Sequence, residues 1–368
     1  MAIDEDNIEA RAGPRGTERR GAKLVLALSL FALAGGLLFA RRAEWAEALD
    51  PRLSAAQRPG PRPSAPDFDL EGVSIPREEI RGGGPPKDGI PALTDPATVA
   101  AGEARYLKAA DRVAGISLRG QARAYPLRIL TWHEIVNDTV GGIPIAVTYC
   151  PLCDSIVVFD RRTPDGVKEF GVSGLLYNSN VLMYDRKGKP EALWSQVKGE
   201  TVSGPGAGTK LEALPVELTT WAAWRSRHPR TTVLASDTGH VRDYGHDPYA
   251  GYFAGPGLMF PVRPANDRLP RKERVLGVWM PDGTAKAYPI SAFGQEKGPV
   301  EIRDEVGGKP LAIRYDPANK SLRVAEAPED VRWMYSFWFA WYAFHPETAV
   351  YEPRWAEDRH PPARTEPK

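Results

Sequence analysis

Cys150 and Cys153 are the only cysteines among the 368 residues, and they stand two residues apart in the segment VTYCPLCDSIVVF. Two thiols at this spacing can point from one turn towards one soft metal ion. A structural zinc site as a rule needs four protein ligands, and the chain has no second cysteine pair. With His133 as a third ligand the pair would suit copper(I), or zinc with an open position. We therefore expect a metal site at Cys150, Cys153 and His133 that holds copper or zinc.

Two other functions remain open for the same cysteines. A thiol–disulfide oxidoreductase would use Cys150 and Cys153 as its catalytic pair, with one thiol of lowered pKa attacking a partner's disulfide. A non-enzymatic scaffold would hold the pair as a structural disulfide, although so short a loop removes little chain entropy. The sequence favours the metal site over redox exchange and redox exchange over the scaffold.

Apolar, β-prone residues flank the cysteines, at 143–147 before them and 156–159 after them. This pattern predicts a strand, a tight turn that carries both thiols, and a second strand. A thioredoxin-type site would place a helix after the second cysteine, which the β-branched residues there disfavour. Elsewhere the pattern predicts two helices, from 127 to about 136 and over 218–227.

An internal repeat relates residues 112–153 to residues 274–317. Both segments contain Arg-Val-x-Gly, then Ala-Tyr-Pro, then Asp-x-Val-Gly-Gly-x-Pro, and each is followed later by tryptophans and a His-Pro pair, at His228 and His345. Such self-similarity indicates two copies of one supersecondary unit. We expect an α+β, mainly β fold with an internally duplicated β-rich unit.

The repeat separates residues needed for folding from candidates for function. The tyrosines, glycine pairs, tryptophans and His-Pro pairs stand in both copies, which predicts a structural role. The second copy has Asp316 where the first has Cys150, and its sequence offers no counterpart of Cys153 or His133. These three residues are therefore the candidate site.

The N-terminal region contains an uncharged run of seventeen residues, LVLALSLFALAGGLLFA, at 24–40. This is the short end of what spans a bilayer as a helix. Five basic residues precede the run, which predicts a cytoplasmic N-terminus. We expect an uncleaved anchor, with a cleaved signal peptide as the alternative. The protein would then be a single-pass cell-membrane protein with most of its chain extracytoplasmic.

The composition is that of a folded protein, with 42% hydrophobic residues, 26% charged residues and a formal charge of +1. This balance argues against a nucleic-acid partner, which would require a basic surplus. The partners that we expect are the membrane, through the N-terminal helix, and an extracytoplasmic protein that exchanges electrons or metal.

The sequence divides the chain into seven segments. They are a cytoplasmic segment (1–23), the transmembrane anchor (24–40), a Pro/Gly-rich linker or clamp (41–103), the first repeat with the cysteines (104–240), a connecting loop region (241–273), the second repeat (274–352) and a polar tail (353–368). In the connecting region, residues 242–253 contain three tyrosines and are expected to form a polar, aromatic surface loop.

Several phrases resemble the "domain of unknown function 3179" family. They are WHEIVND followed by VGGIPIAVTYCPLC, with IPREEI and GGPPKDGIPALTDP upstream and FGVSGLLYNSNVLMYDR, LWSQ and GPGAG downstream. The resemblance covers roughly residues 65–350, and Asp154 stands where the family pattern would have glycine. Family members are similar to exported or membrane-attached prokaryotic proteins, which implies the same for this chain. The resemblance implies one coherent fold and no particular reaction.

Overall fold

The structure is a computed structural model that describes residues 68–204 and 206–353. Strands make up 40% of the described residues and helices 13%, which confirms the expected mainly β, α+β class. The expected anchor at 24–40 lies outside these residues, as do the segment 1–23 and all but the first residue of the predicted tail. No helix within residues 68–204 and 206–353 is long and apolar enough to cross a bilayer.

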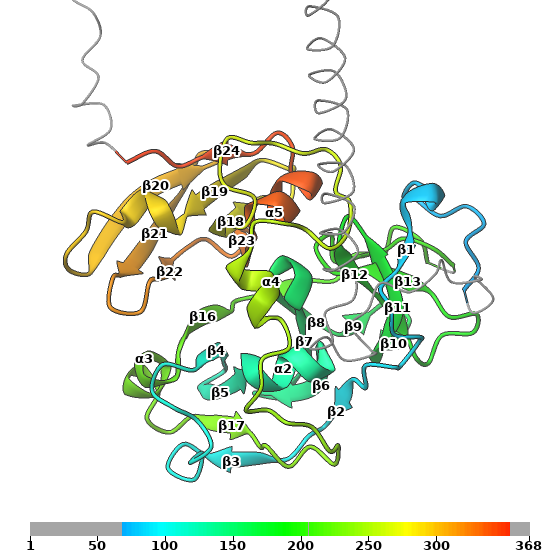
Figure 1. The fold of residues 1–368 in the computed structure, drawn as a ribbon, viewed down its shortest axis with the longest axis horizontal. Helices are drawn as coiled ribbons and strands as arrows, with labels where there is room; N and C mark the ends of the chain where they lie inside the picture. The colour runs from blue at the N-terminus through cyan, green and yellow to red at the C-terminus, as the bar shows by residue number, and fades with distance from the viewer. Residues whose placement is uncertain (1–67, 205, 354–368) are drawn as a thin grey trace, which may run out of the picture. The chain divides into compact units, whose positions relative to one another are not determined.

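The largest sheet of the described region has nine strands and contains the cysteine hairpin (Figure 1). Its order is β2 (Leu93–Thr94), β6 (Ile135–Val140), β7 (Ile143–Cys150), β8 (Ser155–Asp160), β23 (Arg332–Phe337), β18 (Arg274–Trp279), β19 (Ala285–Pro289) and β24 (Ala349–Val350), with β15 (Ala213–Leu214) beside β8.

The other sheets are smaller. One five-stranded sheet has the order β16 (Glu217–Thr220), β4 (Arg112–Leu118), β5 (Gln121–Pro126), β17 (Thr232–Leu234) and β3 (Thr98–Ala100). A second has the order β1 (Arg81–Gly82), β11 (Phe170–Tyr177), β12 (Asn180–Asp185), β13 (Leu193–Ser195) and β14 (Glu200–Thr201). A three-stranded sheet consists of β20 (Val300–Val306), β21 (Lys309–Asp316) and β22 (Ser321–Glu326), and β9 (Arg162–Thr163) pairs with β10 (Gly166–Val167).

The helices are short. They are α2 (Leu127–His133), α3 (Trp221–Arg227), α4 (Ala250–Ala254) and α5 (Trp338–Phe344), together with 3₁₀ turns at Arg77–Glu79, Pro151–Cys153 and Ile290–Phe293. The two predicted helices are present, but each is shorter than expected. Residues 217–220 form strand β16 because they pair with β4, and Thr220 then caps α3 by accepting from the N–H of Ala223.

The two repeats have the same strand order. The first contains β16, β4, β5 and β17 side by side, with β17 parallel to β5. The second contains β23, β18, β19 and β24 in the same arrangement, with β24 parallel to β19. Each set is accompanied by an antiparallel triplet, β6–β7–β8 in the first repeat and β20–β21–β22 in the second. The segments that match in sequence therefore also match in topology.

The shared sequence motifs make the same contacts in both repeats. The rings of Trp224 and His228 have centroids 3.9 Å apart, and so do those of Trp341 and His345. Trp224 donates to the Thr231 hydroxyl at 3.0 Å, as Trp341 does to Thr348 at 2.9 Å. The tryptophans and the His-Pro pairs therefore have the structural role that the repeat predicted.

The hairpin turns that follow β7 and β21 are equivalent as well. Cys150 pairs with Ser155 across the first turn, and Asp316 pairs with Ser321 across the second. The last turn residue has a left-handed backbone in both, with φ of 45° at Asp154 and 46° at Lys320. By this register Asn319 occupies the position of Cys153, a match that the sequence comparison missed.

The described end of the predicted linker or clamp, residues 68–103, contacts three sheets. Its strands β1, β2 and β3 pair with β11, β6 and β17 in turn, as the blue and cyan strands in Figure 1 show. Phe68 and Leu70 are buried against β12. Residues 68–103 are therefore a strap that ties the sheets together, which corresponds to the clamp rather than to the linker.

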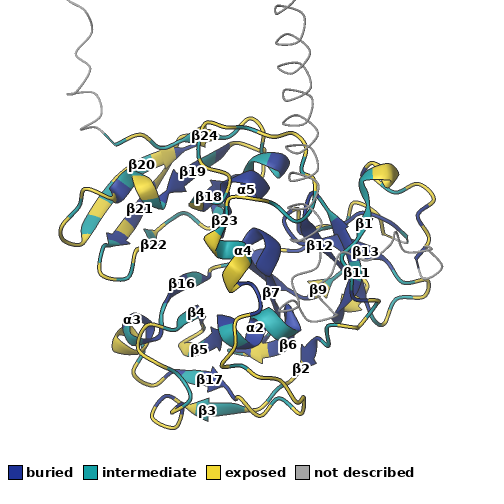
Figure 2. Cartoon of the chain, in the orientation of Figure 1, coloured by how far each residue is buried: buried dark blue, intermediate teal, exposed yellow. Residues whose placement is uncertain are grey.

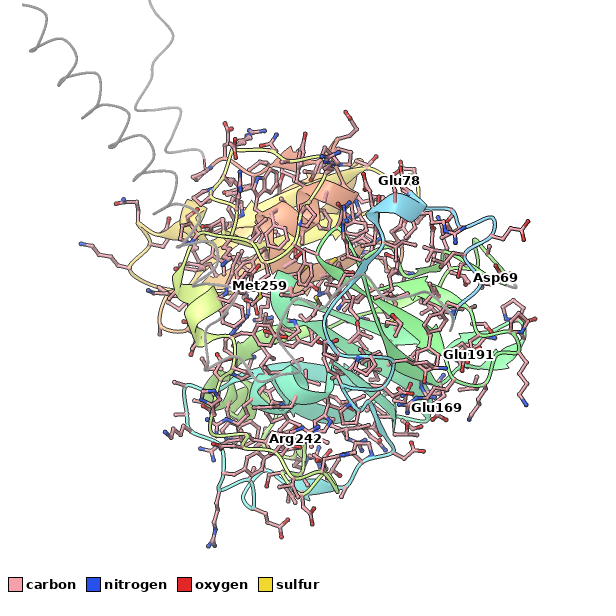
Figure 3. The ribbon with its side chains drawn as sticks, turned by 45° about the vertical axis from the view of Figure 1, so that its right-hand side comes forward. Asp69, Glu78, Glu169, Glu191, Arg242 and Met259 are labelled. Carbon is pink, nitrogen blue, oxygen red and sulfur yellow. The ribbon has the colours of Figure 1, made fainter. Side chains whose placement is uncertain are left out.

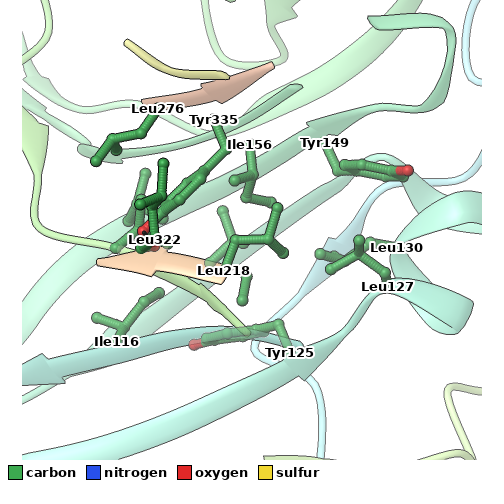
Figure 4. Close-up of a cluster of buried hydrophobic side chains, with 14 of the residues drawn as sticks. Ile116, Tyr125, Leu127, Leu130, Tyr149, Ile156, Leu218, Leu276, Leu322 and Tyr335 are labelled. Atoms are coloured by element: carbon green, nitrogen blue, oxygen red, sulfur yellow. Dashed lines mark hydrogen bonds between the residues drawn. The ribbon is translucent and has the colours of Figure 1, made fainter. Parts of the chain in front are cut away.

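The main hydrophobic core is built by both repeats. Figure 4 shows Ile116 and Tyr125 of the first repeat and Leu276 and Tyr335 of the second on either side of Ile156 from β8. Burial of side chains of this size contributes about 1.5–3 kcal/mol each. Every residue of β8 and every residue of β7 except Pro144 is buried, so both faces of these strands are covered, and β7 is largely dark blue in Figure 2. The cysteine hairpin thus lies inside the protein.

Candidate functional site

The cysteine turn has the predicted strand–turn–strand geometry. β7 ends at Cys150, Pro151–Cys153 form a 3₁₀ turn, and β8 begins at Ser155. Pro151 fits the first turn position because its fixed φ suits that geometry and its missing N–H is not needed there. Asp154 then takes the left-handed conformation, which short polar residues tolerate better than most.

Both thiols are buried and point at one acceptor. Cys150 and Cys153 are 1% and 0% exposed, and both are free thiols. Their Sγ atoms lie 3.7 and 3.2 Å from the carbonyl oxygen of Ser179. Ser179 lies in the two-residue turn between β11 and β12, where Asn178 and Ser179 both have positive φ, as a tight hairpin requires.

A buried polar network supports the turn from the β12 side. Asn180 donates to Gln196 at 2.6 Å and to the Ser155 hydroxyl at 3.3 Å, and it also hydrogen-bonds Cys153. Gln196 in turn donates to the carbonyl of Thr148 at 3.2 Å. Satisfied buried networks of this kind fix a single arrangement of their members. The position of Cys153 is therefore set by side chains from β12 and from the residues after β13.

The two thiols differ in acidity. Burial acts to raise the pKa of Cys150, but hydrogen bonds from the Cys153 thiol and from the N–H groups of Cys153, Val181 and Leu152 outweigh it, so the pKa lies below its ordinary value. Burial and the bond given to Cys150 raise the pKa of Cys153 well above its ordinary value. Cys150 is therefore the more acidic thiol of the pair and Cys153 the less acidic one.

Glu134 is the carboxyl group beside Cys150. Helix α2 ends at His133 rather than near residue 136, because Glu134 takes a φ of 56° and Ile135 begins β6. The N–H of Glu134 donates to Leu130 at 2.7 Å, and its carbonyl accepts from Tyr149 at 2.7 Å. Burial and, second to it, the nearby Cys150 raise the pKa of the Glu134 carboxyl well above its usual range.

His133 does not join the cysteines. Its Nδ1 lies 2.7 Å from the carbonyl of Pro91 and must donate to it, so its Nε2 accepts from the Tyr244 hydroxyl at 2.6 Å. The reversal of the backbone at Glu134 accounts for this, because it sends the two neighbouring side chains to different surroundings. Burial lowers the pKa of His133 to about 4, so the ring is neutral at physiological pH.

The expected three-residue metal cluster of Cys150, Cys153 and His133 is therefore not formed. Nowhere in residues 68–204 and 206–353 do three or more His, Cys, Asp or Glu side chains gather in a group that could hold a metal ion. Both ring nitrogens of His133 are already engaged by protein groups, which leaves no lone pair for a ligand bond. The thiols alone remain as candidate ligands.

Asp154 is held by one arginine from each repeat. Arg112 donates from both terminal nitrogens at 2.9 and 3.0 Å, and Arg274 donates from Nε at 2.7 Å. Tyr149 adds a hydroxyl at 3.0 Å. Although burial acts to raise it, the pKa of Asp154 lies below its usual range because the two guanidinium groups stabilise the carboxylate. We refer to this arrangement as the Asp154 clamp; it fixes the residue directly after Cys153.

Part of the segment predicted as a polar surface loop instead covers the thiols. Tyr252 of α4 donates to the carbonyl of Leu152 at 2.8 Å, and α4 lies beside the cysteine turn in Figure 1. Tyr249 is buried, and together with Glu134 and Met259 it lines a cavity of ≈ 30 Å³. Figure 3 labels Met259. This volume has room for about two water molecules. Nothing in the local sequence of 242–253 indicated that these tyrosines would turn inward.

The fold and the site define a class of mainly β proteins in which two topologically equivalent halves enclose a buried Cys-Pro-Leu-Cys turn. The chain belongs to the family described as "Protein of unknown function (DUF3179)", whose model matches residues 87–332. This confirms the resemblance carried by the sequence phrases. Comparisons with curated proteins and with solved structures find no match.

Proposed function

We propose that the protein is a thiol–disulfide oxidoreductase that uses Cys150 as the attacking thiol and Cys153 as the resolving thiol. The observation that carries the proposal is the inequality of two adjacent free thiols: hydrogen bonds lower the pKa of Cys150, and burial raises that of Cys153. A structural disulfide requires no such difference. Thiolates are the species that attack disulfides, so the lowered pKa favours Cys150 in that role.

The exchange moves two electrons in two steps. The Cys150 thiolate attacks one sulfur of a substrate disulfide, forms a mixed disulfide and expels the other substrate sulfur as a thiolate, which takes a proton from water. Cys153 then attacks the Cys150 sulfur, and its proton passes to the substrate thiolate that leaves. The substrate disulfide is reduced to two thiols, and Cys150 and Cys153 are oxidised to a disulfide.

Glu134 is electrostatically coupled to the attacking thiol. A negative charge on Cys150 adds to burial in raising the pKa of the Glu134 carboxyl. Formation of the mixed disulfide removes that charge, so the pKa of Glu134 falls towards the value that burial alone sets. The buried carboxyl therefore responds to the state of the attacking thiol.

Access to the thiols requires movement of the segment that covers them. Cys150 is 1% exposed, and the cavity of ≈ 30 Å³ beside Leu152 is too small for a protein loop. Two sets of hydrogen bonds hold the covering segment, which contains Tyr252 and Arg263, in place. Tyr252 donates to the carbonyl of Leu152, and Asn178 forms paired bonds with the backbone of Arg263 at 2.8 and 2.9 Å. The substrate is accordingly a small disulfide or an extended protein segment admitted when this cover opens.

Incubation with glutathione disulfide tests the proposal on the full-length chain. Cys153→Ser is expected to accumulate a mixed disulfide on Cys150, because the resolving thiol is gone. The matched variant Cys150→Ser should form a mixed disulfide more than about tenfold more slowly, because its remaining thiol stays protonated. Mass spectrometry of the intact chain measures both. Tyr252→Phe should speed the reaction in wild-type background by loosening the cover.

Equal reactivity of the two serine variants, or no mixed disulfide in either, would refute the redox assignment. A second candidate, binding of copper or zinc by the two thiols, is supported by the convergence of both Sγ atoms on the Ser179 carbonyl. Elemental analysis of the reduced protein, purified without a metal-binding tag, decides between them. One metal ion per chain that is lost in both serine variants would establish the metal site instead. An unreactive disulfide between Cys150 and Cys153 in the wild type would support the third hypothesis, a non-enzymatic scaffold with a structural disulfide.

We further propose that the two repeats descend from one β-rich unit. The support is their shared strand order together with the equivalent Trp–His stacks and Trp–Thr hydrogen bonds. After duplication only the first unit kept, or acquired, the cysteines. The second unit then serves as a scaffold that completes the core and supplies Arg274 to the clamp.

The proposed location is the outer face of a cell membrane, with residues 24–40 as a single anchor. The support is the uncharged run and the basic residues before it. An alkaline phosphatase fusion after Pro96 is expected to be active, since the enzyme folds only outside the cytoplasm. An inactive fusion with an active cytoplasmic reporter at the same position would reverse the orientation. With this location, a redox partner would also lie outside the cytoplasm.

A further inference from the structure

A second cavity lies between the two repeats and is lined by Asp154 but by neither cysteine. Its volume is ≈ 190 Å³. The side chains that matter for its chemistry are Arg112, Arg274, Lys320, Asp154, Thr219 and Ser336. The cavity is therefore more than six times larger than the one beside the thiols, and these charged and hydroxyl groups stand in a wall that is otherwise largely apolar.

The lining comes in pairs of equivalent positions. Arg112 and Arg274 begin the shared Arg-Val-x-Gly motif on β4 and β18. Thr219 pairs with Val113 of β4 as Ser336 pairs with Val275 of β18. Both repeats thus contribute an arginine and a hydroxyl to one space.

The two residues of the third equivalent pair, Asp154 and Lys320, carry opposite charges. Asp154 and Lys320 are the left-handed residues that end the two equivalent turns, and both line the cavity. The lining therefore carries three positive groups and one negative group. Asp154 engages only Nε of Arg274, and no described residue accepts a hydrogen bond from the terminal nitrogens of that guanidinium or forms an ion pair with Lys320. The cavity lining therefore has a net positive charge.

The hydroxyl of Ser336 supports a ligand in this cavity independently of the charges, because it lacks a hydrogen-bond partner. Ser336 is 2% exposed, and its buried Oγ has no hydrogen-bond partner among the described residues. A buried hydroxyl without a partner costs free energy, and such groups as a rule await a water, an ion or a ligand. The equivalent Thr219 is better satisfied, with its hydroxyl 3.5 Å from that of Ser321.

We propose that this cavity binds a small divalent oxyanion of the size of phosphate, held by Arg274 and Lys320 with the Ser336 hydroxyl as an additional donor. Guanidinium groups bind such anions through paired N–H donors, and lysine contributes a point charge. Arg112 keeps both of its hydrogen bonds to Asp154, so it positions the site and does not bind the ion itself. This anion site does not include the thiols, so its test is independent of the test of the redox proposal.

Thermal unfolding of the full-length protein in rising phosphate concentration, at constant ionic strength with chloride, tests the site. Wild-type Tm should rise in a saturable way, because a ligand that binds only the folded state stabilises it. Lys320→Gln should weaken the apparent affinity about tenfold, since it removes a charged donor. Ser336→Ala should weaken the affinity about fivefold and leave the phosphate-free Tm unchanged or higher, because it removes a hydroxyl that has no partner there. A purely structural serine would behave in the opposite way.

Lys297→Gln is the matched control, because Lys297 is also exposed and forms no ion pair among the described residues, yet it lies outside the cavity lining. It should keep the wild-type response to phosphate. The proposal is overturned if wild-type Tm does not saturate with phosphate, if Lys320→Gln and Ser336→Ala both respond as the wild type does, or if Lys297→Gln loses as much affinity as Lys320→Gln. None of these results bears on the reactivity of Cys150.

Discussion

Replacing Asp154 by alanine is expected to lower the free energy of unfolding by about 3–5 kcal/mol, the range for breaking a buried ion pair on one side. The carboxylate is 1% exposed and compensates Arg112 and Arg274 together. Its removal leaves both guanidinium groups facing each other without a counter-charge and orphans the Tyr149 hydroxyl. Urea unfolding at neutral pH measures the loss.

The matched control for this change is Asp330→Ala. Asp330 pairs with Lys309 at 3.2 Å on the surface, where both side chains are more than two-fifths exposed. Exposed pairs of this kind contribute about 0–1 kcal/mol. If Asp154→Ala were no more destabilising than Asp330→Ala, the clamp would have no role in holding the two repeats together.

The Asp154 clamp also gives a pH dependence of defined sign. The folded pKa of Asp154 lies below its ordinary value of about 3.9, so the unfolded chain takes up the proton first as acid is added. The stabilisation is therefore complete at neutral pH and is lost as pH falls below about 4. Asp154→Asn cannot titrate, so the gap in stability between it and the wild type should narrow in acid. A gap that is constant from neutral pH into acid would contradict this.

Gly115→Ala and Gly277→Ala are each expected to cost about 3 kcal/mol, at the upper end of the range for overpacked cores. A Cβ at Gly115 would lie 2.2 Å from the ring of Trp224, and one at Gly277 would lie 2.3 Å from the ring of Trp341. Each indole is fixed by a stacked histidine and a threonine hydroxyl, so it cannot withdraw. Both variants should show lower urea midpoints with an unchanged m-value.

Gly298→Ala is the control for the glycine variants. A Cβ at Gly298 would meet no atom within 4 Å, and the backbone there does not have a positive φ. Its stability should stay within about 0.5 kcal/mol of the wild type. Equal costs at Gly115 and Gly277 would also show that the Arg-Val-x-Gly motif has one physical purpose in both repeats, namely close approach of a tryptophan to a strand. A cost at only one of them would break the equivalence.

The sequence predicted those parts of the molecule whose cause is local. Alternating β-prone residues around Cys150 and Cys153 were enough for the hairpin, and the repeated motifs were enough for two matching halves. The prediction failed at His133, because the end of a helix depends on a single backbone angle at Glu134 that pattern reading does not detect.

The remaining features of the site arise from contacts between distant parts of the chain. Ser179 is 26 residues from Cys153, and Arg274 is 120 residues from Asp154, and both contacts depend on how sheets pack. The repeat could have pointed to Arg274, since it matches Arg112 in the shared motif. The inward turn of Tyr249 and Tyr252 had no such signal, because a loop of tyrosines and charged residues has the same composition whether it covers a site or faces solvent.

Asp154 and Lys320 occupy equivalent positions in the two repeats yet carry opposite charges. A tandem duplication in one chain allows such a difference, whereas a symmetric homodimer does not. Two identical subunits related by a two-fold axis must present every residue twice. A homodimer of the first repeat would therefore place two aspartates opposite two arginines, and the interface would be neutral and closed to anions. In the tandem chain each copy can mutate alone, so one turn can end in Asp154 and the other in Lys320, and the cavity that both residues line has a net positive charge.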